Sequence, residues 1–186
     1  MTTETTFSEA LPKTALVEII SAATTEVFTT MLNLPASPGP VHTEPATAIA
    51  PHSGIFSLIG LAGSWAGTGC LACSGTLACR LAEHFLMTPF EAVNEEVLDA
   101  VGEITNMIIG NVKTALEERV GPMGLSTPTV IYGRNFQTRS ARVNDWIVVP
   151  FESADETLWV QLCVGPNQDS RGSVRAGFQL PQVLNI

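Results

Sequence analysis

The side chains in this chain that are best placed for chemistry lie on one helical run whose two sides differ in character. At 100° per residue, Asp99, Glu103, Asn106, Gly110 and Lys113 fall within an arc of about 80°. This face therefore presents a carboxylate and a carboxamide one turn apart. A carboxylate accepts hydrogen bonds and pairs with cations, and a carboxamide offers one acceptor and two donors.

The other side of the run predicts a helix over about residues 95–118, buried along one stripe. Apolar residues recur there at steps of three and four, and they are Val97, Val101, Ile104, Ile108, Val112 and Ala115. Lys113 is expected to be a surface residue. Gly110 interrupts the polar face, where a glycine costs about 1 kcal/mol relative to alanine. That cost is easier to understand if another backbone must come close at this point.

Two further helices are predicted around this run. Residues 11–32 carry apolar side chains at helical spacing until Pro35 ends the pattern. Residues 77–87 form a shorter helix that stops before Pro89. Residues 35–53 are rich in proline, so we expect them to form a loop or a loosely paired edge segment outside the core.

The remaining patterned segments predict one sheet. The expected strands are 54–61, 69–74, 129–134, 146–151 and 158–164, with a hairpin turn at 63–67 and a loop at 119–127. Pro150 suggests that its strand lies at an edge or ends nearby. The order α-β-β-α-α-β-β-β implies an α+β fold, with helices packed on one largely antiparallel sheet.

Composition limits the domain count and the partners. The 186 residues suffice for one domain with tails. We assign 1–10 to a flexible N-terminus, 11–165 to the domain and 166–186 to a tail or terminal strand. The net charge of −9 comes without a basic cluster, which argues against nucleic acid and anionic membrane surfaces as partners. No segment is expected to span a membrane, the N-terminus does not resemble a signal peptide, and four cysteines do not make a disulfide scaffold, so a cytoplasmic location with reduced thiols is expected.

The pattern Asp99-x3-Glu103-x2-Asn106, followed by Pro128, resembles the signature of the CheC/CheX/FliY phosphatases, and the similarity is greatest to CheX. The helix at 25–32, the glycine-bearing hairpin at 60–67 and the three late strands match CheX elements in order, so the resemblance covers about residues 11–165. It implies a CheC-like fold. It also implies a protein-aspartyl-phosphate phosphatase acting on a CheY-like response regulator, in chemotaxis or related two-component signalling.

The resemblance also implies roles for three residues of the polar face. Asn106 would enter the partner's site and orient the attacking water, and Glu103 would pair with the partner's lysine. Asp99 would support docking. From its cost in the helix rather than from the resemblance, Gly110 is expected to leave room for another backbone. The chain would need no cofactor of its own, because the response regulator carries the Mg²⁺ and the remaining task is positioning. A homodimer formed through the sheets is the expected assembly.

Two other interpretations remain open. The same fold could bind a receiver or a flagellar-switch component without turning it over. Alternatively, Cys70 and Cys73 form a C-x-x-C that could be a thiol site, or a zinc site for which Cys79 and His84 are the nearest second ligand pair. Because residues three apart on a strand point to opposite faces, we favour buried small apolar residues for this pair.

Several other residues carry structural expectations. Trp65, at the predicted hairpin tip, is either a contact residue or a buried cover for the sheet. Trp146 and Trp159 alternate with apolar residues and are predicted to lie in the core. His84 and Pro128 are predicted to be structural, with Pro128 fixing the entry into the next strand.

Overall fold

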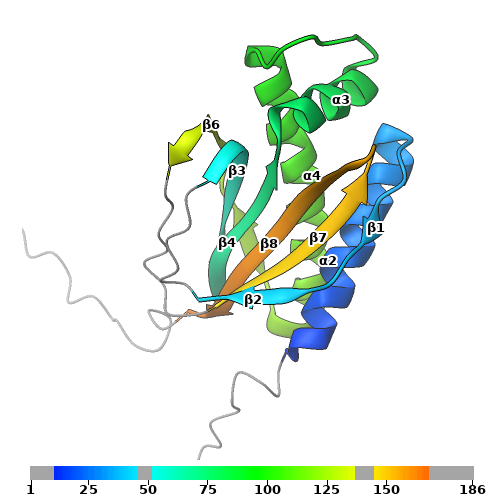
Figure 1. Ribbon diagram of the computed structural model, residues 1–186. Helices are drawn as coiled ribbons and strands as arrows, with labels where there is room; N and C mark the ends of the chain where they lie inside the picture. The colour runs from blue at the N-terminus through cyan, green and yellow to red at the C-terminus, as the bar shows by residue number, and fades with distance from the viewer. Residues whose placement is uncertain (1–10, 46–51, 137–144, 168–186) are drawn as a thin grey trace, which may run out of the picture.

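The computed structural model describes residues 11–45, 52–136 and 145–167, and places three helical segments against one face of a sheet (Figure 1). These segments are α2 (Lys13–Val27) continuing into the π-helix η1 (Phe28–Leu32), α3 (Gly75–Leu86) and α4 (Glu95–Val120). The three helices predicted from periodicity are therefore confirmed. Residues 1–10 and 168–186 lie outside the described residues, so their assignment as tails stays a prediction.

The sheet confirms the α+β fold class, because every strand pair is antiparallel. Its main path runs β1-β7-β8-β4-β3-β5, while β2 also pairs with β7 and β6 with β3. The strands are β1 (Ser37–Pro38), β2 (His42–Glu44), β3 (His52–Gly63), β4 (Trp65–Cys73), β5 (Met123–Leu125), β6 (Thr129–Phe136), β7 (Trp146–Ser153) and β8 (Glu156–Pro166).

Three details of the sheet differ from or refine the sequence prediction. The proline-rich segment supplies β1 and β2, which pair loosely along β7 as an edge. The return strand of the hairpin begins at Trp65 rather than at residue 69, because the β3–β4 ladder continues to Leu61 opposite Gly67. The predicted loop at 119–127 is wrong in part, since residues 123–125 form β5 along the end of β3.

The core lies between the sheet and the helices, and it explains why α2 is so apolar. By length and composition alone, Lys13–Leu32 could cross a membrane, which corrects the expectation that no segment qualifies. In the structure Leu16, Ile20 and Phe28 of this segment are fully buried in the main hydrophobic cluster. The same side chains that give the segment its hydropathy therefore pack against α4 and the sheet.

The tryptophans divide between the two faces of the sheet. Trp65 is only 8% exposed and belongs to the main core, so its interpretation as buried cover is confirmed. Trp159 is 37% exposed, and its prediction as a core residue is wrong. Its neighbours Leu158 and Val160 point into the core, so the alternation of the strand turns Trp159 toward the face without helices.

Candidate functional site

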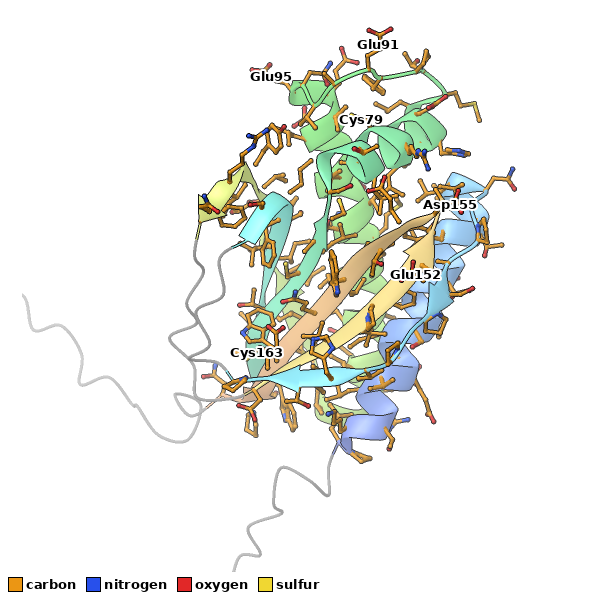
Figure 2. The ribbon with its side chains drawn as sticks, viewed as in Figure 1. Cys79, Glu91, Glu95, Glu152, Asp155 and Cys163 are labelled. Atoms are coloured by element: carbon orange, nitrogen blue, oxygen red, sulfur yellow. The ribbon has the colours of Figure 1, made fainter. Side chains whose placement is uncertain are left out.

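The candidate site lies on α4, a helix that is well defined at its start and deeply packed. The side chain of Asn94 caps it by accepting a hydrogen bond from the backbone N–H of Val97 at 2.9 Å. Glu95 and Glu96 occupy the first turn, where negative charge favours the helix dipole. Figure 2 shows Glu95 pointing to solvent where the loop carrying Glu91 enters α4.

Burial along α4 confirms the predicted stripe and widens it. Five of its six members are fully buried, and Ala115 is half-buried. Further residues beside the stripe are also buried, namely Ala100, Gly102, Thr105, Ile109 and Leu116. The side of the helix that is not buried carries the predicted site residues.

The structure brings the predicted site residues onto one surface. Asp99 and Glu103 are exposed, and Asn106 and Gly110 are half-buried. Within the described part of the chain, the side chains of Asp99, Glu103 and Asn106 make no hydrogen bond or ion pair. Their donors and acceptors are therefore available to a second molecule, while the buried side of α4 holds the backbone beneath them in place.

Two glycines on α4 differ in what surrounds them. A Cβ on Gly102 would lie 3.3 Å from Val130 Cγ2 and 3.6 Å from Pro128 Cγ, so this glycine allows close packing of β6. A Cβ on Gly110 would meet only Leu125 Cδ1, at 3.9 Å, which is ordinary contact. The packing of this chain therefore does not require a glycine at position 110, whereas it favours one at position 102.

Lys113 is more constrained than a free surface residue. Its Nζ lies 2.9 Å from Glu117 Oε2, and Glu117 Oε1 accepts a hydrogen bond from the backbone N–H of Met123 at 2.7 Å. Two hydrogen bonds lower the pKa of the Glu117 carboxyl: the one from the Met123 N–H has the larger effect, and the one from Lys113 has the smaller. Sequence reasoning missed this connection, because nothing in the local pattern ties residue 117 to residue 123.

The cysteines do not form the alternative site. All four side chains are buried, and among the described residues no group of His, Cys, Asp or Glu could hold a metal ion. Cys70 and Cys73 pack in separate clusters on opposite faces of the sheet, as predicted. Burial is the main cause that raises the pKa of Cys73 to about 12, and the negative charge of the nearby Glu156 adds to it. The thiolate of Cys73 is therefore strongly disfavoured. In Figure 2, Cys79 and Cys163 lie toward opposite ends of the molecule.

His84 and Pro128 have the structural roles predicted for them. The Nδ1–H of His84 donates to the backbone oxygen of Leu32 at 2.9 Å and so closes the end of η1. Pro128 packs its ring against α4 beside Gly102, immediately before β6 begins. Neither residue belongs to the exposed face of α4.

A shallow groove also lies on the helix-free face of the sheet. Its volume is about 280 Å³, and its lining includes Phe56, Trp159 and the pair of His42 and Glu44, whose Nε2 and Oε1 atoms lie 3.3 Å apart. Phe56 and Trp159 point away from the helices, so the sheet separates this groove from Glu103 and Asn106. The groove is therefore not part of the candidate site on α4.

Comparisons with known proteins agree with this arrangement. The family model described as "Chemotaxis phosphatase CheX" matches residues 55–152, which is more than half of the chain. The solved structure of CheX from Vibrio vulnificus is 28% identical with a TM-score of 0.71, and the match covers 81% of this chain and 99% of that chain. CheX from Desulfovibrio desulfuricans is 25% identical with a TM-score of 0.72, covering 81% and 99%.

A more distant solved structure is the CheX–CheY–BeF3–Mg²⁺ complex from Borrelia burgdorferi. It is 22% identical with a TM-score of 0.65, and the match covers 80% of this chain and 97% of that chain, so the likeness concerns the fold. None of the curated proteins matches the chain.

Proposed function

The chain belongs to the CheX family of chemotaxis phosphatases, and on that premise we propose that it dephosphorylates the phosphoaspartate of a CheY-like response regulator. Asn106 orients the attacking water, and Glu103 pairs with the active-site lysine of the partner. Asp99 supports the docking surface, and Gly110 gives the partner's backbone room. The pathway is chemotaxis or a related two-component circuit.

One observation carries the proposal. Glu103 and Asn106 stand one turn apart on the exposed face of a helix whose other sides are buried, and neither side chain has a partner among the described residues. A carboxamide held in this way can accept one hydrogen bond from water and donate others to the site it enters. Such positioning is what hydrolysis of an activated phosphoryl group requires.

The metal in this reaction comes with the partner. The Borrelia complex contains CheX and CheY together with BeF3 and Mg²⁺. We propose that here, too, the receiver carries the metal and this chain does not. Mg²⁺ on the receiver neutralises charge on the phosphoryl oxygens. This chain then contributes an amide and a carboxylate, which do not depend on a cofactor of its own.

The experiment that tests the proposal is loss of phosphate from a purified phosphorylated receiver with catalytic amounts of this protein. Asn106→Ala should abolish the stimulation and leave thermal unfolding unchanged. Asn111→Ala is the matched control, because Asn111 is an exposed asparagine on the same helix whose Nδ2 lies 3.4 Å from Glu26 Oε2. Equal stimulation by the wild-type protein and Asn106→Ala would contradict the mechanism. Stoichiometric binding of the receiver without turnover would instead identify a non-catalytic binding module.

We further propose that the protein is a cytoplasmic homodimer. Within the described residues, β6 pairs only with β3, so the eight residues of Thr129–Phe136 leave one strand edge open. Tyr132 on this edge is 56% exposed. An open edge with an exposed aromatic side chain suits pairing with a second copy. Sedimentation that gives the mass of a monomer at micromolar concentration would contradict the dimer.

A further inference from the structure

A β-bulge interrupts the edge strand formed by β5 and β6. Leu125 of β5 lies opposite Leu61, and Thr129 of β6 lies opposite Leu58. Between these two pairs the edge strand has one residue more than β3, which defines a bulge. We call residues 126–128 the bulge segment. Bulges of this kind often lie beside active sites, where they redirect a side chain.

Hydrogen bonds fix the bulge segment to β3. The backbone N–H of Ser126 donates to the oxygen of Gly60 at 2.9 Å. The Ser126 Oγ accepts from the N–H of Gly60 at 2.9 Å and donates to the oxygen of Thr127 at 2.9 Å. One serine therefore holds both sides of the bulge, and the position of Thr127 is set by the sheet.

The bulge segment runs alongside the site residues of α4. Pro128 Cγ lies 3.6 Å from the Cβ position of Gly102, and Leu125 Cδ1 lies 3.9 Å from that of Gly110. Asn106 stands midway between these two glycines along the helix. The chain between Leu125 and Pro128 therefore passes Asn106 and forms a wall on one side of it.

Thr127 is the residue of this wall with unused polar groups. It is exposed, and among the described residues neither its hydroxyl nor its backbone N–H has a hydrogen-bond partner. Because Pro128 follows it, its backbone is restricted to extended conformations. Thr127 is thus held on the segment that passes Asn106, and its hydroxyl has no partner among the described residues.

We propose that the hydroxyl of Thr127 contacts the docked receiver and so helps to hold it against the face of α4 that carries Asn106. The inference rests on the proposed function for the identity of the partner. The bulge segment, which is hydrogen-bonded to β3, limits how far the receiver can move past the side of α4. Gly110 has no side chain, so the receiver has room to reach the bulge segment.

The test compares Thr127→Val, which keeps the shape and removes the hydroxyl, with Thr127→Ser, which keeps the hydroxyl. Thr127→Val should raise both KM for the phosphorylated receiver and Kd for the BeF3–Mg²⁺ form of the receiver by about 3- to 10-fold, the effect of one hydrogen bond. kcat should stay within about twofold, and Thr127→Ser should restore wild-type values. Thr129→Val is the matched control, because the neighbouring Val130 packs on α4 and strand alternation turns Thr129 to the other face.

The two readouts separate this inference from the proposed function. A wild-type protein that binds the BeF3–Mg²⁺ receiver but does not turn over would overturn the function, and the Kd series would still decide the role of Thr127. Unchanged Kd and KM in Thr127→Val would overturn the inference while turnover stands. A loss that Thr127→Ser fails to rescue, or that is matched by a lower unfolding temperature, would show a structural role and overturn it as well.

Discussion

Lys113 and Glu117 form an ion pair, with 2.9 Å between Nζ and Oε2, that also fastens β5 to the end of α4. The fastening works because the second carboxylate oxygen accepts the N–H of Met123. One glutamate therefore satisfies a side chain on the site face of the helix and a backbone donor on the next strand. The wall beside Asn106 begins at that strand.

Replacing Glu117 with alanine should destabilise the protein in a pH-dependent way. The folded carboxyl has a pKa below the ordinary value of 4.5, so it stabilises the fold above that pH. The difference in urea midpoint between the wild-type protein and Glu117→Ala should therefore be full at about pH 7 and shrink as the pH falls below 4.5 through the lowered pKa. Glu118→Ala, at an exposed neighbouring position, is the comparison variant. A difference that stays constant from pH 7 to 3 would contradict the assignment.

Replacing Glu103 with alanine should weaken docking more than it slows chemistry. Loss of a charge-assisted contact to the partner's lysine predicts a rise in KM of about 10-fold with kcat nearly retained. The salt dependence of KM should fall at the same time. Steady-state kinetics at two ionic strengths measures both effects. Glu18→Ala is the control, since Glu18 is exposed on α2. Ser21 follows Glu18 at the spacing at which Asn106 follows Glu103. An equal rise in KM for both variants would show that the effect is not specific to α4.

Replacing Gly110 with alanine should stabilise the fold and impair the reaction. The added Cβ has room, with its nearest neighbour at 3.9 Å, and alanine favours a helix by up to about 1 kcal/mol over glycine. The unfolding midpoint should rise, whereas Kd for the receiver should increase because the methyl group occupies the space left for the partner. Tight binding with raised stability would show that the partner does not approach this position. Gly102→Ala is the comparison, because there the new atom meets Val130 at 3.3 Å within the protein.

Replacing His84 with alanine should lower stability without affecting turnover. The variant leaves the oxygen of Leu32 without the hydrogen bond from Nδ1, and one such bond contributes about 0.5–1.5 kcal/mol. Chemical unfolding measures the loss, and the receiver assay should give wild-type kinetics. Glu83→Ala, on the same exposed side of α3, should change neither quantity. Reduced turnover at unchanged stability would point to a role for His84 near the site.

The native protein should resist alkylation of its thiols. All four cysteines are buried, and the pKa of Cys73 is raised to about 12, so little thiolate is available at about pH 8. Mass spectrometry after iodoacetamide treatment should find native protein unlabelled and urea-unfolded protein labelled on all four. Rapid labelling of Cys73 in the native state would revive the interpretation as a thiol site.

Periodicity was sufficient to predict α4 and the members of its polar face. The stripe from Val97 to Val112 has one helical period, and burial on one side leaves Glu103 and Asn106 on the other. The pattern failed where strands are short or open. β5 has only three residues after Pro122 and pairs with a strand more than fifty positions away, so its ladder has no local signal.

The sequence also could not predict which face of the sheet is covered by helices, or the register in which β5 and β6 pair with β3. Trp159 alternates with apolar neighbours as a core residue would, but only the positions of the helices decide which face of the sheet becomes the core. The bulge at 126–128 appears only when the pairings of β5 and β6 with β3 are compared. For that reason Thr127, beside the predicted site, was not among the candidate residues.

The depth at which α4 is buried has a consequence for the energetics of docking. Since Ile104 and Ile108 are wholly enclosed, the backbone under Asn106 should exchange its amide hydrogens only when the whole domain opens. The backbone that carries the Asn106 carboxamide is then ordered before the partner arrives, and binding spends no free energy on ordering this segment.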